Sequence, residues 1–285
     1  MIPMSGKLLL VDGMNLLFQM FFGMPSRIFN SQGRAIHGTM GFTGALRRML
    51  EMTEPSHVLV VFDGEHGNPR TRLSAEYKAN RPDFTDVPEE ENPFSQLPDI
   101  YRVLDGMGIR HCETEDCEAD DMIAAYTAAC RSTMDIVVSS FDSDFFQLIG
   151  PGVSVMRYRG EKTVVCDEAW LTGKYGIEGR SYVDFKSLTG DAADNIRGID
   201  GVGPKTAAAL VNRFGTIENL IKEYTSIENR RLRGLIGNGL DRLPVNKALI
   251  KMDECARMPY TAEELEFGGK PASTREILTA AGLLP

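Results

Sequence analysis

The sequence has few cysteines, no long apolar segment and no excess of positive charge. Its five cysteines are odd in number and none belongs to a Cys-x-x-Cys pair, so neither a disulfide framework nor a cysteine-based zinc site is expected. No run of 18 apolar residues occurs, which predicts no transmembrane helix. The first residues lack the pattern of a signal peptide, and we expect a protein of the reducing cytoplasm.

The shortage of positive charge at first argues against a nucleic-acid partner. The chain of 285 residues has 31 Lys plus Arg against 40 Asp plus Glu, a net charge of −9. Nine of these acidic residues are candidate metal ligands, and without them the remaining carboxylates equal the basic residues in number. The rest of the surface would then be neutral overall and could carry local basic patches, which makes DNA binding possible.

Acidic residues are concentrated in two short segments. Residues 118–121 have the sequence Glu-Ala-Asp-Asp, and Asp142 and Asp144 flank a serine 24 positions later. Carboxylates packed closely raise each other's pKa, and hard divalent cations relieve that repulsion. The segments therefore indicate a divalent-metal centre. Taken alone, residues 118–121 are equally typical of a helix N-cap and first turn, which often collect acidic residues.

Three apolar runs end in aspartate, at Asp12, Asp63 and Asp142. Such runs are typical of strands that are buried on both faces of a parallel sheet. Helical patterns at 41–53 and 95–106 lie between them, so we expect an α/β sheet. The carboxyl ends of its strands would bring the three aspartates to one edge, where active sites of such sheets lie.

Residues 64–96 interrupt this alternation of strands and helices. The segment contains Arg70, Arg72 and the run Tyr-Lys-Ala-Asn-Arg at 77–81, and it becomes acidic and proline-containing from Asp83. A loop of this length inside a compact domain is usually functional or disordered. Its basic and aromatic run could hold phosphates, and a mobile surface insertion is the alternative.

A glycine-rich turn lies in the later part of the chain, at 198–206. It precedes a helical run at 207–214, and Pro204 suits a first helical turn, whose backbone N–H groups bind anions. A P-loop would need glycine directly before Lys205, so we favour a helix-hairpin-helix that holds a DNA backbone. An ordinary helical packing unit is the alternative. Asp191 and Asp194 just before it would share a face of a helical turn.

Seven motifs occur in one order along the chain. They are Val-Asp-Gly-x-Asn, Val-Phe-Asp, Tyr-Lys-Ala-Asn-Arg-Pro, Glu-Ala-Asp-Asp, Asp-x-Asp-x-x-Gln-Leu, Thr-Gly-Asp-x-x-Asp-Asn and Gly-Val-Gly-x-Lys-Thr-Ala. Together they resemble the 5′-nuclease (flap endonuclease) superfamily, and most of all the 5′→3′ exonuclease domain of bacterial DNA polymerase I. No polymerase domain follows, so we expect a stand-alone protein, encoded by a bacterium or a phage.

The resemblance implies a PIN-like α/β nuclease domain over 1–178, with an arch or loop insertion at about 64–96. A helical DNA-binding domain would follow over 179–285, with its helix-hairpin-helix at about 190–215. The arch departs from the family in being acidic over residues 83–91, which leaves open how tightly it clamps a threaded strand.

The resemblance also assigns roles to single residues. Around a first Mg²⁺ it places Asp12, Asp63, Glu118 and Asp120. Around a second it places Asp142, Asp144 and Asp194, with Asp121 and Asp191 nearby. Mn²⁺ could substitute for either ion. Lys78 and Arg81 match the basic residues at the base of the arch and are expected to be catalytic. The expected DNA contacts are Phe18, Tyr77, Gly201, Gly203, Lys205 and Thr206, and the hairpin would hold K⁺.

These features predict a structure-specific 5′→3′ exonuclease or flap endonuclease that hydrolyses phosphodiester bonds by a two-metal mechanism. Its partners would be DNA with 5′ flaps, nicks or 5′ ends, with RNA-primed DNA as a further candidate and no membrane. We expect a monomer. The alternatives are a PIN-type ribonuclease and a non-catalytic protein that binds DNA structures.

Overall fold

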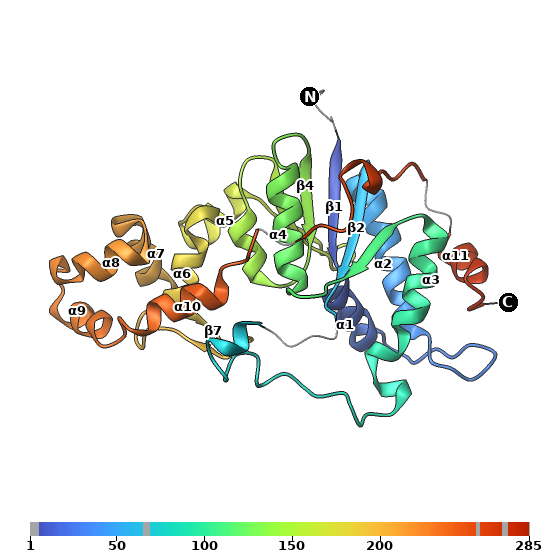
Figure 1. Ribbon diagram of the computed structural model, residues 1–285, viewed down its shortest axis with the longest axis horizontal. Coiled ribbons are helices and arrows are strands. Elements are labelled where there is room, and N and C mark those ends of the chain that lie inside the picture. The colour runs from blue at the N-terminus through green and yellow to red at the C-terminus, as the bar shows by residue number, and fades with distance from the viewer. Residues whose placement is uncertain (1–5, 65–68, 255–256, 270–272, 285) are drawn as a thin grey trace.

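A six-stranded, mostly parallel sheet organises the first half of the chain in the computed structural model (Figure 1). The structure describes residues 6–64, 69–254, 257–269 and 273–284. The strand order is β3-β2-β1-β4-β5-β6, and only the edge strand β6 is antiparallel. The strands are β1 (Lys7–Asp12), β2 (His57–Phe62), β3 (Arg110–Glu113), β4 (Asp135–Ser139), β5 (Val153–Arg157) and β6 (Val164–Cys166). The predicted α/β sheet is therefore confirmed.

The central strands are buried because consecutive side chains enter different cores on the two faces of the sheet. Leu8 and Leu10 of β1 pack with α4 (Ala119–Cys130) and with helices of the second half of the chain. Leu9 and Val11 point to the opposite core, formed with α1 (Gly13–Gly23), α2 (His37–Thr53) and α3 (Leu97–Met107). This alternation explains why the strands are continuously apolar in sequence.

Helices α1 and α4 begin next to the strand-end carboxylates. The side chain of Asp12 accepts a hydrogen bond from the backbone N–H of Asn15 and so caps α1. Helix α1 was not predicted from the sequence pattern. Asp63 accepts from the backbone N–H of Ala119 at 2.8 Å, which fixes the start of α4 at the same edge of the sheet.

The second half of the chain is helical. Its helices are α5 (Glu168–Tyr175), α6 (Tyr182–Thr189), α7 (Pro204–Phe214), α8 (Ile217–Glu223), α9 (Arg230–Gly237) and α10 (Arg242–Ile250). Between α6 and α7 lies a short hairpin of β7 (Gly190–Asp191) and β8 (Ile196–Arg197). Asp191 therefore lies in β7 and Asp194 in the turn that follows it, and not on the predicted helical turn, because the helix ends at Thr189.

Two segments connect the halves. The stretch from Pro69 to Gln96 contains only short 3₁₀ turns (Pro69–Arg72, Glu89–Glu91, Pro93–Gln96), and it starts near α10 and β7 before running back to α3 (Figure 1). After α10 the chain returns to the half that contains the six-stranded sheet, where α11 (Thr274–Ala280) packs through Ile277 and Leu278 on Ile36 and Val103. The predicted second domain, 179–285, thus includes a segment that packs on the first.

None of the helices in the described ranges has the length and apolar character needed to cross a membrane.

Candidate metal centre

The carboxyl edge of the sheet gathers the aspartates that end β1, β2 and β4. Asp12 accepts a hydrogen bond from Ser140 Oγ at 2.8 Å, and Asp142 accepts from the backbone N–H of Asp144 at 2.8 Å. Burial, together with the negative charges of Asp63 and Asp142, raises the pKa of Asp12 to about 7. Carboxylates that repel one another in a buried setting are suited to binding a cation.

A first group of three carboxylates lies at the start of α4. Oxygens of Glu118, Asp120 and Asp121 are all within 4.8 Å of one another. Glu118 is also the N-cap residue of α4 and forms a reciprocal capping box with Asp121. The helix-cap and metal-site interpretations of this segment are therefore compatible, because capping is what fixes the spacing of the carboxylates.

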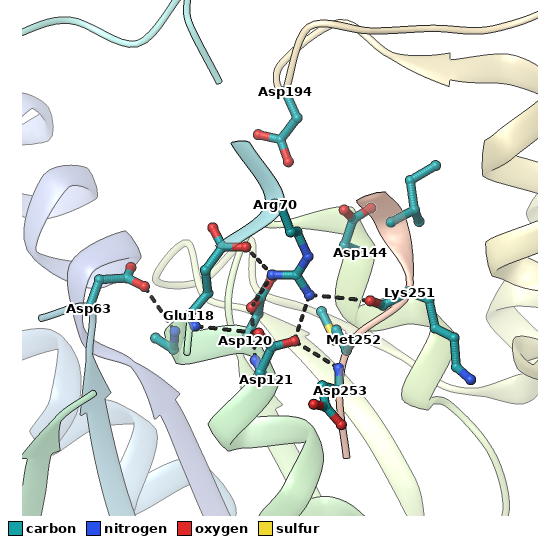
Figure 2. A network of polar contacts seen from close by, with 12 residues as sticks. Asp63, Arg70, Glu118, Asp120, Asp121, Asp144, Asp194, Lys251, Met252 and Asp253 are labelled. Carbon is teal, nitrogen blue, oxygen red and sulfur yellow. Dashed lines mark hydrogen bonds and ion pairs between the residues drawn. The ribbon is translucent and has the colours of Figure 1, made fainter. Parts of the chain in front are cut away.

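Arg70 lies in the middle of this first group (Figure 2). Its guanidinium donates to Glu118 and, at 2.5 Å, to Asp121, and it lies 3.5 Å from Asp120. It also donates to the backbone carbonyl of Lys251 at 3.2 Å, so it joins the half with the six-stranded sheet to the segment after α10. Only 8% of Arg70 is exposed. Arg70 lies in the insertion, where its basic character was the only signal in the sequence and no role was assigned to it.

A second group contains Asp144, Asp191 and Asp194, again with oxygens within 4.8 Å of one another. Lys186 of α6 forms ion pairs with both Asp144 and Asp191 and was not predicted as a site residue. Asp121 was expected near this second group. It lies instead in the first group, because its carboxylate caps α4 and accepts from the backbone N–H of Asp253 at 2.7 Å.

Lys78 and Arg81 contact members of both carboxylate groups. The ammonium of Lys78 pairs with Glu118, and its backbone N–H donates to the carbonyl of Asp194 at 3.1 Å. Arg81 pairs with Asp194 at 3.2 Å. Lys78 has a left-handed backbone conformation with φ of 56°, which is uncommon for lysine and costs free energy. The backbone at Lys78, in the segment predicted to form an arch, is thus strained, and the Lys78 side chain reaches the first group.

The protein's own cations divide the carboxylates into two electrostatic classes. Burial raises the pKa of Asp144 to about 7 despite Lys186, and burial and the charge of Glu118 hold the pKa of Asp120 well above its usual range. Burial would also raise the pKa of Glu118, but Lys78 and Arg70 outweigh it and lower that pKa. In the first group, burial and the neighbouring charges therefore shift the pKa values of Asp120 and Glu118 in opposite directions.

Phe18 and Tyr77, both predicted to contact DNA, have different surroundings. Phe18 is half-buried and packs edge-on against Phe84 and Phe94, with ring centroids 5.6 and 5.5 Å away. Tyr77 is only 4% exposed, and its hydroxyl donates to Glu118 at 3.3 Å. The Tyr77 ring is therefore enclosed and its hydroxyl supports Glu118, and the DNA contact expected of Tyr77 stays a prediction.

The glycine-rich turn that was predicted as the hairpin of a helix-hairpin-helix follows the β7–β8 hairpin and lies directly before α7. Gly201 has φ of +79°, a conformation that favours glycine, and Gly203 is the N-cap of α7 with Pro204 at the first helical position. Lys205 is exposed, and Thr206 is half-buried. No side chain caps α7 and its first turn contains no acidic residue, so its N–H groups are available to an anion.

Comparisons with known proteins place this geometry in a family. Residues 7–176 match the family model described as "5'-3' exonuclease, N-terminal resolvase-like domain". Residues 177–273 match "5'-3' exonuclease, C-terminal SAM fold". The chain belongs to the 5′-3′ exonuclease family. The exonuclease is 30% identical to a "5'-3' exonuclease" of Streptomyces coelicolor over 95% of this chain and 94% of the relative.

DNA polymerase I proteins are further relatives. The exonuclease is 32% identical to that of Streptococcus pneumoniae strain R6 over 92% of this chain, but it spans only 30% of the polymerase's length. Two solved structures share its fold. Zinc-bound T5 5′-exonuclease has a TM-score of 0.71 at 19% identity, covering 96% of this chain and 99% of that one. The catalytic core of Rad2 in complex with DNA substrate has a TM-score of 0.63 at 17% identity, covering 99% and 90%.

Proposed function

We propose that this exonuclease hydrolyses phosphodiester bonds near the 5′ ends of DNA, as a structure-specific 5′→3′ exonuclease or flap endonuclease. The observation that carries the proposal is the meeting of two carboxylate groups from different parts of the chain at one edge of the sheet. Lys78 and Arg81 lie between them. A solvated acidic surface would not bury Glu118, Asp121, Asp144 and Asp194 together.

The donor set fits hard divalent cations. Each group offers three carboxylate oxygens in mutual proximity and no histidine or cysteine, which is the ligand chemistry that Mg²⁺ and Mn²⁺ prefer. Glu118, Asp120 and Asp121, with Asp12 and Asp63, would hold one ion, and Asp144, Asp191 and Asp194, with Asp142, the other. Such a pair of ions activates water and stabilises the attacking and leaving oxygens of an in-line displacement.

The other residues bind and orient the substrate in this proposal. Lys78 places a positive charge beside the scissile phosphate, where negative charge develops. Arg81 would add a second charge at the other carboxylate group. Phe18 of α1, which packs against Phe84 and Phe94, would stack on an unpaired base. The hairpin with Gly201 and Gly203, together with Lys205 and Thr206, would hold the duplex backbone, with K⁺ bound at the hairpin.

The names of the relatives support DNA as substrate, since Rad2 was solved "in complex with DNA substrate". We propose 5′ flaps, nicks and 5′ ends as the bound structures, with RNA-primed DNA as a further substrate. We also propose that the protein is a monomer, that it acts in the cytoplasm and that a bacterium or a phage encodes it.

The test replaces two of the aspartates that would hold the second ion with asparagine, which is close to aspartate in size and shape. Asp142→Asn combined with Asp144→Asn should abolish cleavage of a 5′-labelled flap in Mg²⁺, while flap binding in Ca²⁺ persists. A nicked duplex and a single-stranded RNA are assayed beside it, each with Mg²⁺ and with EDTA. Full activity of the double variant would remove the second group from the mechanism, and cleavage of RNA alone would establish a PIN-type ribonuclease instead.

A further inference from the structure

Lys186 is a buried cation that the proposed reaction does not use. It lies on α6, a helix of the second half of the chain, and only 5% of the residue is exposed. Burying a lysine ammonium costs free energy unless it is paired and hydrogen-bonded. Helix α6 belongs to the hydrophobic core through Tyr182, Phe185 and Leu188. The Lys186 side chain extends from this core helix, and its ammonium lies in the second carboxylate group.

The ammonium has a complete set of partners. It donates to Ser143 Oγ at 2.9 Å and pairs with one carboxylate oxygen each of Asp144 and Asp191. A lysine ammonium has three N–H donors, and these three acceptors account for all of them. Asp144 follows β4 of the sheet and Asp191 lies in the hairpin after α6. Lys186 therefore connects carboxylates that come from the two halves of the chain.

The same two carboxylates are needed by a divalent cation. Asp144 and Asp191 are two of the three members of the second group, and their oxygens lie within the distances that one ion could span. The third member, Asp194, is paired with Arg81. An ammonium seated between Asp144 and Asp191 repels a divalent ion that approaches the same oxygens, and it stabilises the pair when no ion is bound.

We propose that Lys186 is a built-in competitor of the divalent cation at the second carboxylate group. Its ammonium holds Asp144 and Asp191 together in the metal-free protein and gives way when the ion binds. Lys186 thereby weakens binding of that ion and preserves the folded site without it. This inference rests on the proposed function, because it requires that the second group bind a divalent cation.

The experiment compares metal-free and Ca²⁺-bound stability of Lys186→Met, which keeps most of the length of the unbranched side chain and removes its charge. In EDTA the melting temperature should fall below that of the wild type, since two buried carboxylates lose their counter-ion. Addition of Ca²⁺ should raise it by more than it raises the wild type, because a ligand that binds the folded state more tightly stabilises it more. Calorimetric titration should show one Ca²⁺ bound at least tenfold more tightly.

Two variants serve as controls. Lys247→Met also removes a paired lysine, since Lys247 contacts Asp184 at 2.8 Å and Glu218 at 2.9 Å, but it lies outside both carboxylate groups. Any loss of melting temperature it causes should be the same in EDTA and in Ca²⁺. Lys186→Arg retains the charge and should bind Ca²⁺ with an affinity close to the wild type.

The outcomes separate this inference from the function on which it rests. If Ca²⁺ stabilises wild type and Lys186→Met equally, Lys186 is an ordinary structural lysine and the inference fails while the metal site stands. If Ca²⁺ stabilises neither protein, the metal site fails and the inference with it. Should Lys186→Met not fold, Lys186→Gln takes its place, and failure of that variant to fold even in Ca²⁺ contradicts competition.

Discussion

At the scale of single residues, Lys78 joins the segment 69–96 to the first carboxylate group. Its ammonium pairs with Glu118, and its backbone is held in a left-handed conformation by a hydrogen bond to the carbonyl of Asp194. Strained backbone persists only where the surrounding structure requires it, and it is common at active sites. The role proposed for Lys78 is a charge that acts on the reacting phosphate more than on the affinity for DNA.

Lys78→Ala should therefore lower the single-turnover rate and spare binding. Loss of one electrostatic donor to a transition state typically costs ~10²–10³ in rate, about 3–4 kcal/mol. The measurement is single-turnover cleavage of a 5′-flap with enzyme well above its dissociation constant. Lys78→Arg should recover only part of the rate, because a guanidinium restores the charge without the compact geometry. An unchanged rate for Lys78→Ala, with weaker binding, would make Lys78 a simple phosphate contact.

At the scale of elements, α7 is built to meet an anion. The helix begins at Pro204 after a glycine N-cap, and no side chain occupies its free N–H groups. Lys205 is exposed in its first turn. The dipole and the lysine act together there, which suits a DNA phosphate and carries no information about base sequence.

Lys205→Ala should weaken duplex binding to the same extent for all sequences and reduce the salt dependence of binding, as the slope of log K against log salt, by about 1. Fluorescence anisotropy at several salt concentrations on two unrelated duplexes measures both effects. Lys222→Ala, a change of an exposed lysine on α8, is the matched control and should leave the slope unchanged. A loss that depends on the DNA sequence would indicate base contacts by Lys205 instead.

At the scale of the whole molecule, the gathered carboxylates make stability depend on pH when metal is absent. The folded-state pKa values of Asp12 and Asp144 are raised from 3.8 to about 7, chiefly by burial. Between these values the folded protein binds more protons than the unfolded chain. The contribution of these two groups to stability is therefore full below about pH 4, falls as the pH rises towards 7 and stays low above it.

Asp12→Asn should accordingly stabilise the metal-free protein at pH 8 and have little stabilising effect at pH 4. The gain at pH 8 should be a few kcal/mol at most, since each pKa unit corresponds to about 1.4 kcal/mol, and the asparagine oxygen can still cap α1. Thermal unfolding in EDTA at both pH values measures the difference. In Mg²⁺ at pH 8 the sign should reverse, because the variant lacks a ligand; stabilisation that is equal at both pH values would contradict the role of burial.

Local sequence determined the sheet, the edge at which the site lies and the hairpin before α7. Apolar runs that end in Asp12, Asp63 and Asp142 are sufficient to predict the sheet and the edge at which the site lies. A strand buried on both faces has a recognisable composition, and its carboxyl end has a fixed direction. The glycines of the hairpin and Pro204 likewise act within a few residues, so their conformation is encoded where they stand.

Only the tertiary structure decided which side chains meet the carboxylates. Arg70 lies 48 residues from Glu118, and Lys186 lies 42 residues from Asp144, so no spacing in the sequence relates either pair. Tyr77 is enclosed, and Asp121 joins the first group, for the same reason. A buried charge or hydroxyl takes the partner that the packing of distant elements brings within reach, and that choice is made by the fold as a whole.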